Sequence, residues 1–241
     1  MTQPRLDTFR LRPGDTIADK YEVISKLGKG WESEVYLVRE RRTGIPRAAK
    51  LFFPQRNERN RAVRFHARKL HRLRDCPIVI QYHTQEHFDF KGTPITLLIS
   101  EFVEGERLSR FLKRQPGGRL TPFQAIHLLH ALAKGIECIH ERGEYHGDLH
   151  TDNVIVKSFG LGFELRLFDM FRWKGTVVEN IQEDVVNLIR IFHESLGGRK
   201  FYARQPPEVK AICCGLKRTL ILRKFKTAGR LRAYLEAMIW R

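Results

Sequence analysis

The stretch that decides the fold reads Tyr145-His146-Gly147-Asp148-Leu149-His150-Thr151-Asp152-Asn153. It places an acid, two imidazoles and an amide in a short turn between a long helical pattern and the apolar run at residues 154–156. Catalytic groups concentrate in loops between rigid elements. In this loop Asp148 can accept a proton from a hydroxyl group, and Asn153 can offer its carbonyl oxygen to a hard metal such as Mg²⁺.

A second oxygen ligand follows the next apolar run. Asp169 comes directly after residues 163–168 and could add a carboxylate to a metal held by Asn153. A base together with two oxygen ligands is the minimum that phosphoryl transfer from a magnesium nucleotide requires. The sequence therefore predicts a catalytic Asp148 beside a metal site made by Asn153 and Asp169.

Length and composition favour a cytoplasmic protein with an anionic partner. The 241 residues suffice for two lobes, without a signal-like N-terminus or a stretch near the ~20 apolar residues of a membrane span. Lys and Arg outnumber Asp and Glu by 44 to 27, and the net charge of +17 indicates a nucleotide, nucleic acid, acidic lipid or phosphorylated substrate. No Cys-x-x-Cys pair occurs, and reduced thiols are expected at Cys76, Cys138, Cys213 and Cys214.

Patterns of period two predict an antiparallel sheet of about five strands in the first half of the chain. An irregular leader is expected over residues 1–20. The strand-like runs lie at residues 21–27, 34–38, 47–53, 78–82, 86–90 and 96–102. One amphipathic helix with a basic outer face is predicted over residues 57–74.

The second half of the chain is predicted to be helical. Helices are expected at residues 108–113, 121–142, 183–196, 207–222 and 227–240. The longest begins with a capping box, in which Thr121 is the N-cap and Gln124 stands three residues later, and it ends at Gly143. The fold class is therefore α+β.

Two glycines mark the turn between the first two strands. In Gly28-x-Gly30-x-x-Ser33, the glycines let the backbone approach a phosphate, while Ser33 stands where a third glycine would complete the pattern. Such a turn also occurs in ordinary hairpins, and a strand lysine such as Lys50 is often merely solvated. The order of glycine turn, strand lysine, Asp/Asn loop and strand-end Asp169 is what indicates a phosphate site.

These motifs together resemble the protein kinase superfamily over residues 21–197. The glycine turn resembles its nucleotide-covering loop, and Ala48-Ala49-Lys50 resembles its Val-Ala-Ile-Lys strand. The family's hinge has its counterpart in a stretch that resembles it, Ser100-Glu101-Phe102-Val103-Glu104-Gly105. Residues 146–153 resemble His-Arg-Asp-Leu-x-x-x-x-Asn, and Asp169-Met170-Phe171 resembles Asp-Phe-Gly. Asp184 resembles the buried aspartate that braces the catalytic loop in this family.

The resemblance implies a bilobal protein-kinase-like fold, with an N-lobe over residues 21–103 and a C-lobe over residues 104–241. It implies ATP and Mg²⁺, with Asp148 as the base, Lys50 on the α- and β-phosphates, and Asn153 and Asp169 on the metal. The glycines that would cover the phosphates are Gly28 and Gly30. Adenine would be sandwiched by Leu27, Val35, Ala48 and Ile155 and paired with the backbone of Glu101 and Val103.

The helix at residues 57–74 departs from the family pattern. It should carry a glutamate that pairs with Lys50, but alignment on the following Cys76-Pro77 places Ala67 or His66 there. Either Lys50 has another carboxylate partner or its geometry is unusual.

The catalytic loop also departs from the pattern. Gly147 replaces the arginine that receives an activation-loop phosphate, and His150 replaces the lysine of Ser/Thr protein kinases. The sequence His-Gly-Asp-Leu-His is instead similar to the loop of aminoglycoside, choline, sugar and lipopolysaccharide kinases. The interval from Asp169 to the next predicted helix is short and leaves little surface for a peptide.

Three functions remain open. The first is an ATP- and Mg²⁺-dependent phosphotransferase of the atypical Ser/Thr protein kinase type. The second is a small-molecule or glycan kinase, including a lipopolysaccharide kinase. The third is a nucleotide-binding pseudokinase that acts as an interaction module, which the missing helix glutamate favours and the intact Asp148, Asn153 and Asp169 oppose.

A separate hypothesis concerns the basic C-terminal helices. They could bind an anionic partner such as nucleic acid or a membrane surface, although a solvated helix face is the more ordinary interpretation. The residues concerned are Lys217, Arg218, Arg223, Lys224, Lys226, Arg230 and Arg232.

Overall fold

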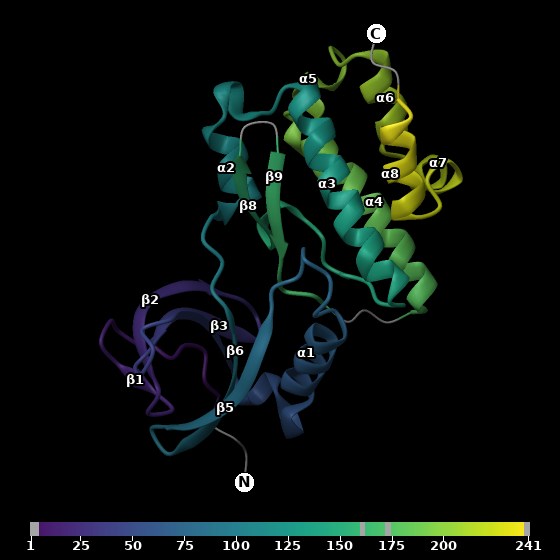
Figure 1. The fold of residues 1–241 in the computed structure, drawn as a ribbon. Coiled ribbons are helices and arrows are strands. Elements are labelled where there is room, and N and C mark those ends of the chain that lie inside the picture. Colours follow the sequence, from purple (N-terminus) through teal and green to yellow (C-terminus); the bar gives the residue numbers. More distant parts are fainter. Residues whose placement is uncertain (1–4, 160–161, 172–174, 239–241) are drawn as a thin grey trace. The chain divides into compact units, whose positions relative to one another are not determined.

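Within residues 5–159, 162–171 and 175–238, which the computed structural model describes, an antiparallel sheet of six strands forms one of two units (Figure 1). This first unit comprises Met1–Arg74 and Ile80–Val103, and the second comprises Asp75–Val79 and Glu104–Arg241. The strand order is β1-β2-β3-β4-β6-β5. The strands are β1 Thr16–Ile17, β2 Tyr21–Lys29, β3 Ser33–Glu40, β4 Pro46–Phe52, β5 Tyr82–Phe90 and β6 Thr93–Glu101.

Alternating side chains pack the core on one face of this sheet. Tyr36 and Val38 on β3, and Ala49 and Leu51 on β4, are fully buried in one cluster. Successive side chains of a strand point to opposite faces. The intervening residues, including Lys50, therefore lie on the face turned away from this cluster.

The segment predicted as an irregular leader contains a strand and packs into the core. β1 pairs with β2, and the buried ring of Phe9 stacks on Phe53 with 5.5 Å between the ring centroids. The fully buried carboxylate of Glu34 accepts hydrogen bonds from Thr8 Oγ1 at 2.8 Å and from Phe9 N at 3.2 Å. A strand of two residues gives no period-two signal, which is why β1 was not expected.

The basic helix is shorter than predicted. The helix α1 spans Arg61–Arg72 rather than residues 57–74, because the two residues before it have left-handed φ angles of 49° and 58°. Its Val63 is buried against Phe52 of β4 and Leu98 of β6. This packing holds α1 against the sheet.

The predicted strand at residues 78–82 is wrong. Val79 instead makes an isolated bridge to Leu167, and Leu167 N donates to Ile78 O at 2.6 Å, all within the second unit. The hairpin of β5 and β6 begins at Tyr82. A short apolar run does not distinguish a strand from a buried connection, because both exclude water.

The second unit is mainly helical, and it also contains a small antiparallel sheet in the order β7-β8-β9. Its strands are β7 Glu106–Arg107, β8 Val154–Phe159 and β9 Gly162–Leu167. Its helices are α2 Leu108–Arg114, α3 Pro122–Glu141, α4 Val177–Ser195, α5 Arg199–Tyr202, α6 Pro207–Cys213, α7 Arg218–Lys224 and α8 Ala228–Glu236. α3 and α4 lie side by side, and α8 contacts α3 (Figure 1). The expected α+β class is confirmed.

The capping box predicted for the longest helix is present. Thr121 Oγ1 accepts from Gln124 N at 3.3 Å, and Gln124 Oε1 accepts from Thr121 N at 3.0 Å. α4 begins at Val177, earlier than the predicted start at residue 183, because Thr176 and Glu179 form a second capping box. This capping box is visible in the sequence as Thr176 followed three residues later by Glu179.

The predicted helix at residues 207–222 is divided in two. Cys214, Gly215 and Leu216 have positive φ angles between 50° and 60°, which end α6 and separate it from α7. α8 begins after Thr227, whose hydroxyl accepts a hydrogen bond from Arg230 N at 3.2 Å. In the described part of the chain, no helix has the length and apolar character needed to span a membrane.

Candidate active site

The loop at residues 145–153 follows α3 and is held by a buried carboxylate of α4. Asp184 accepts hydrogen bonds from His146 N at 2.6 Å and from Gly147 N at 3.0 Å. Its Oδ2 also lies 3.2 Å from His140 Nε2 on α3. Hydrogen bonds to a charged acceptor are stronger than those between neutral groups, so the backbone of the loop is firmly positioned. These contacts are those expected of a bracing aspartate.

The fully buried ring of His146 connects the loop to the chain after β9. Its Nδ1 accepts a hydrogen bond from Asp148 N at 3.2 Å, and its Nε2 lies 3.1 Å from Phe168 O. An acceptor role for Nδ1 and a donor role for Nε2 place the ring proton on Nε2. Both ring nitrogens of His146 are therefore engaged by the backbone, and the ring orients the backbone of Asp148.

Asp148 and Asn153 are joined directly. The side-chain amide nitrogen of Asn153 donates to Asp148 O at 2.8 Å and to Asp148 Oδ2 at 3.1 Å. Asn153 is buried, whereas 45% of the Asp148 side chain is exposed. Both hydrogen bonds use the NH₂ group of Asn153, so its carbonyl oxygen is the atom suited to a metal.

The pairing of β8 with β9 places the residue before Asp169 beside Asn153. Val154 pairs with Leu167, and Phe168 N donates to Asn153 O at 3.3 Å. Asp169 follows at once, with an exposed side chain and a left-handed φ of 55°. A carboxylate and an amide oxygen are hard ligands, and their chemistry fits Mg²⁺.

His150 faces the carboxylate of Asp148. Its Nε2 lies 3.6 Å from Asp148 Oδ2, while its Nδ1 accepts from Asp152 N at 3.2 Å. The contact with His150 lowers the pKa of Asp148, and the hydrogen bond from the Asn153 amide acts in the same direction. In turn, the contact with Asp148 raises the pKa of His150. Asp148 is therefore kept as a carboxylate.

Gly147 is required by its surroundings. Its φ is +85°, and a Cβ built on it would collide with Phe171 O. Phe171 N in turn donates to His146 O at 2.9 Å. With Phe171 in this position, no arginine fits in place of Gly147.

In the first unit, the strand register aligns the predicted phosphate contacts. Gly28 on β2 pairs with Val35 on β3, and Val35 pairs with Lys50 on β4. Ala48 lies two residues before Lys50 and therefore on the same face of β4. Leu27 is exposed and lies where the pairing of β2 with β3 is irregular, between Lys26 and Gly28. The sheet thus gathers these predicted nucleotide contacts on the face opposite its core.

Lys50 has a carboxylate partner in the glycine turn. Its Nζ lies 2.9 Å from Glu32 Oε1, and His66 Nε2 on α1 lies 2.8 Å from the same oxygen. Burial opposes ionisation of Glu32, but the hydrogen bond from His66 and the charge of Lys50 outweigh it and lower its pKa to about 2. Of the two residues at which the resemblance places the helix glutamate, His66 and Ala67, His66 thus contacts the carboxylate that pairs with Lys50.

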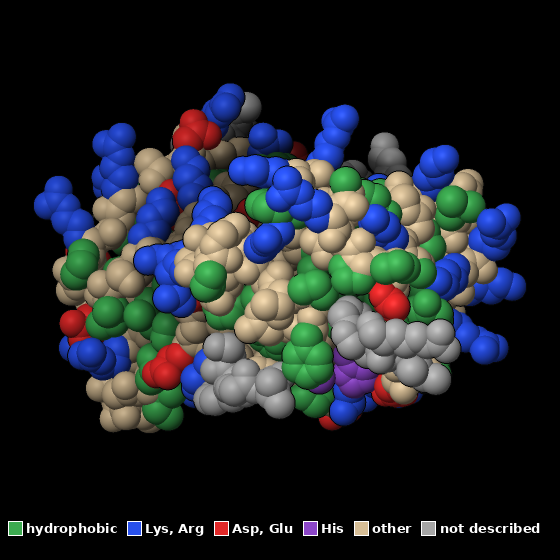
Figure 2. Space-filling view, turned by 90° about the horizontal axis from the view of Figure 1, so that it is seen from above, with side chains coloured by type: hydrophobic (Ala, Val, Ile, Leu, Met, Phe, Trp, Pro, Cys, Tyr) green, Lys and Arg blue, Asp and Glu red, His purple; other side chains and the backbone are tan. Residues whose placement is uncertain are grey.

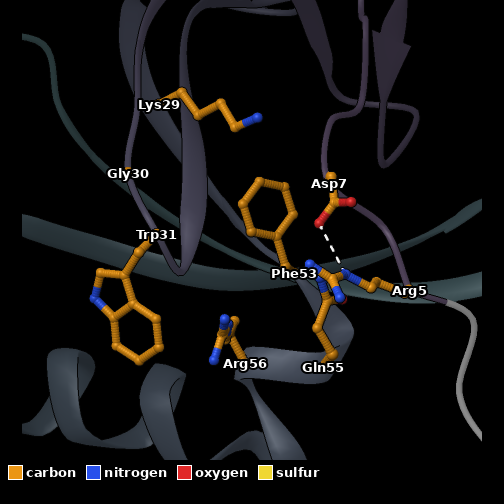
Figure 3. A pocket seen from close by; sticks show the side chains of 8 residues that line it. All are labelled: Arg5, Asp7, Lys29, Gly30, Trp31, Phe53, Gln55 and Arg56. Carbon is orange, nitrogen blue, oxygen red and sulfur yellow. Dashed lines mark hydrogen bonds and ion pairs between the residues drawn. The ribbon is translucent and has the colours of Figure 1, made fainter.

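The turn also lines a cavity of about 370 Å³ in the first unit, beside the N-terminal segment and the residues after β4. In Figure 3, the guanidinium of Arg56 lies next to the indole of Trp31, and its carbon is 4.8 Å from the ring centroid. A cation over an aromatic face is attracted by the ring quadrupole. This contact ties the tip of the turn to the segment that leads into α1.

The remaining predicted contacts lie at strand positions in both units. Glu101 ends β6, where Glu101 N donates to Gln81 O at 2.9 Å, and Val103 is two residues further on. Ile155 lies on β8 in the second unit, where a Cβ at Gly105 would collide with it. Gly105, with a φ of +141°, therefore permits the chain to pass Ile155 closely.

The structure groups the predicted site residues within each unit. Asp148, Asn153 and Asp169 belong to connected loops of the second unit, and Lys50 belongs to the face of the first. Glu32 was not among the predicted site residues, although it lies inside the glycine turn. Its local signal is an acidic residue within that turn.

Comparison with known proteins identifies relatives. A family model described as "Protein kinase domain" matches residues 21–171. Serine/threonine-protein kinase pkn2 of Myxococcus xanthus is 32% identical over 163 residues, which cover 66% of this chain and 19% of that protein. Cyclin-dependent kinase 14 of Callithrix jacchus is 30% identical over 178 residues, which cover 71% of this chain and 39% of that protein. The chain thus spans less than half the length of these curated relatives.

Solved structures give the same fold. A mutant kinase domain of Mycobacterium tuberculosis PknI matches with a TM-score of 0.67 and 18% identity, covering 94% of this chain and 98% of that one. A double mutant of the same domain matches with a TM-score of 0.63 and 19% identity, covering 95% and 97%. The fold expected from the sequence motifs is confirmed.

Proposed function

Because the chain belongs to the protein kinase family, whose model it matches over residues 21–171, we propose that it is an ATP- and Mg²⁺-dependent phosphotransferase of the atypical Ser/Thr protein kinase type. The observation that carries the proposal is the loop in which Asp148 is held by Asn153 and braced by Asp184. A general base must be ionised and oriented. The lowered pKa of Asp148 meets the first condition, and these hydrogen bonds meet the second.

Each candidate residue has one role in this proposal. Asp148 orients and deprotonates the acceptor hydroxyl, and Asn153 Oδ1 and Asp169 hold Mg²⁺. The metal would neutralise charge that develops on the phosphates. Lys50 binds the α- and β-phosphates, as its position on the face of β4 opposite the core cluster supports.

The nucleotide base has a proposed site of its own. Leu27, Val35 and Ala48 offer apolar surface on the sheet face that carries Lys50, and Ile155 offers it in the second unit. The backbone of Glu101 and Val103, at the end of β6, would pair with adenine. Gly28 and Gly30 would cover the phosphates, since glycine permits close backbone approach.

A small-molecule or glycan acceptor is the second candidate. It is favoured by the early start of α4, because only residues 170–176 separate Asp169 from that helix. Little chain is available there on which a peptide could lie. His150 beside Asp148, in place of the family's lysine, supports the same alternative.

A pseudokinase has less support than the sequence suggested. The missing helix glutamate was its main argument, and Lys50 has a carboxylate partner in Glu32. The intact Asp148, Asn153 and Asp169 also favour transfer over binding alone.

An anionic partner for the C-terminal helices remains a weaker proposal. Arg232 lies 2.5 Å from Glu137 Oε2, and Arg218 lies 3.3 Å from Glu183 Oε2, so part of the positive charge is already compensated. Lys and Arg side chains are spread over much of the face shown in Figure 2. The cytoplasmic location predicted from the cysteines also remains a prediction; all four cysteines are described, and each is a free thiol.

Radiolabelled ATP with Mg²⁺ tests the proposed function. Wild type and Asp148→Asn are incubated separately with Ser/Thr peptide mixtures, kanamycin, choline and lipopolysaccharide. Label is expected in the peptides with wild type and to fall by about 10²–10⁴-fold in the variant. Label in a small acceptor alone selects the second candidate. Equal label with both proteins in every acceptor contradicts the assignment of Asp148.

A further inference from the structure

His66 is one of the two residues of α1, with Ala67, at which the resemblance places the family's lysine partner. This buried histidine does not contact Lys50 directly in the manner of a carboxylate, because an imidazole offers no negative charge. Instead, His66 Nε2 and Lys50 Nζ contact the same atom, Glu32 Oε1, at 2.8 and 2.9 Å. The three side chains form a chain from α1 through the glycine turn to β4.

Glu32 is fixed by its backbone as well as by its side chain. Glu32 O accepts a hydrogen bond from Phe53 N at 2.9 Å, which fastens the turn to the end of β4. Within the turn, Gly30 N donates to Ser33 O at 2.9 Å. The guanidinium of Arg56, which lies next to the indole of Trp31, also holds the residue before Glu32 (Figure 3). The carboxylate therefore sits on an anchored segment.

The surroundings of the three side chains strengthen their interaction. The Glu32 side chain is 12% exposed, that of Lys50 17% and that of His66 9%. Solvent screens partly buried charges much less than exposed ones. The ring of buried Phe52 packs beside two of them, with its centroid 5.4 Å from Lys50 Nζ and 5.6 Å from the His66 ring.

We propose that Glu32 is the positioning residue for Lys50, and that His66 clamps Glu32 in place. The carboxylate that orients the phosphate-binding lysine is thus supplied by the glycine turn and not by the helix. This inference rests on the proposed function, because the position of Lys50 matters for phosphate binding. It also makes the orientation of Lys50 depend on the conformation of the turn that would cover the nucleotide.

The test moves the carboxylate from the turn to the helix. Glu32→Gln keeps the shape and removes the charge, and His66→Glu places a carboxylate at the helix position. We expect Glu32→Gln to lower kcat/KM for ATP at least tenfold and to weaken binding of a non-hydrolysable Mg-ATP analogue. The double variant Glu32→Gln with His66→Glu should recover a large part of both losses. Glu58→Gln, an exposed acid just before α1, is the matched control and should behave as wild type.

The outcomes separate this inference from the proposed function. If wild type binds the analogue but transfers no phosphate to any acceptor, the proposed function fails, and analogue affinity still tests Glu32. If wild type is active and Glu32→Gln matches it in turnover and affinity, the positioning role is wrong. A rise in either quantity in Glu32→Gln would overturn the proposal as well, since Glu32 would then be inhibitory. If Glu32→Gln does not fold, Glu32→Asp replaces it, because its shorter side chain withdraws the carboxylate from Lys50. Lower turnover and analogue affinity in Glu32→Asp then support the positioning role, and values equal to wild type overturn it.

Discussion

Asn153 donates its side-chain amide to both the backbone oxygen and the carboxylate of Asp148, at 2.8 and 3.1 Å. A single buried side chain thus fixes the proposed base and also presents an oxygen to the proposed metal. The two proposed functions of Asn153 are inseparable in geometry, because the amide NH₂ and the carbonyl oxygen belong to one rigid plane. Loss of Asn153 should therefore affect metal dependence and turnover together.

Asn153→Ala tests this coupling. We expect the Mg²⁺ concentration for half-maximal activity to rise at least about tenfold, together with a lower kcat. Activity titrated with Mg²⁺ provides the measurement. Asn187→Ala on α4, whose Oδ1 accepts from Arg190, is the control and should leave the titration unchanged. A variant with reduced kcat and unaltered Mg²⁺ dependence would argue against a ligand role.

Asp184→Asn should destabilise the second unit. The buried carboxylate accepts two backbone hydrogen bonds, and an amide would turn an NH₂ group toward one of those donors. We expect the free energy of unfolding to fall by about 2–4 kcal/mol. Urea denaturation measures this change. Glu183→Gln, at the half-exposed neighbouring residue, should cost less than about 1 kcal/mol. Similar losses in the two variants would mean that Asp184 does not brace the loop.

Gly147→Ala should disturb the catalytic loop far more than Gly143→Ala. Both glycines have positive φ angles, but only at Gly147 would a Cβ collide with a neighbour, the backbone oxygen of Phe171. Gly143 has nothing within 4 Å of such a Cβ. We expect a loss of about 1 kcal/mol at Gly143, and several times that at Gly147. Thermal unfolding of both variants measures these losses. Equal shifts of the unfolding temperature in the two variants would contradict the steric role of Gly147.

His150→Gln should move the acid limb of the pH–activity profile to higher pH. The contact with His150 holds the pKa of Asp148 below its usual value of 3.8, so its removal raises that pKa. Activity needs the carboxylate, and at the pH of this limb His150 is protonated because its own pKa is raised. The profile of kcat/KM between acid and neutral pH gives the shift. His71→Gln on α1 is the control, and a shift in the opposite direction would refute the role of His150.

The motifs predicted the elements that carry the site because their signals are local. The capping box at Thr121 and the apolar run before Asp169 are complete within a few residues, and both elements form as expected. Thr176 and Glu179 carried an equally local signal that was overlooked. The break at Gly215 was also visible as a glycine inside a helical pattern, but its left-handed neighbours were not.

The partner of Lys50 could not be predicted from spacing. Glu32 and His66 meet through the packing of α1 against β4 and β6, which depends on Val63, Phe52 and Leu98. An acidic residue in a turn is usually solvated. The residues next to Glu32 in the sequence do not reveal that Lys50, on β4, lies beside it. Such a contact depends on tertiary structure, so the sequence could state only that a carboxylate was missing from the helix.

The buried carboxylate of Glu34 limits how far this protein can be truncated from its N-terminus. Similarity to the family begins at residue 21, but Thr8 and Phe9 satisfy Glu34 from the segment before it. A recombinant fragment that starts at residue 21 would keep Lys26 and Tyr36 as donors and lose the other two. The family match and the folded unit therefore begin at different residues. The match begins at residue 21, and the folded unit begins before it.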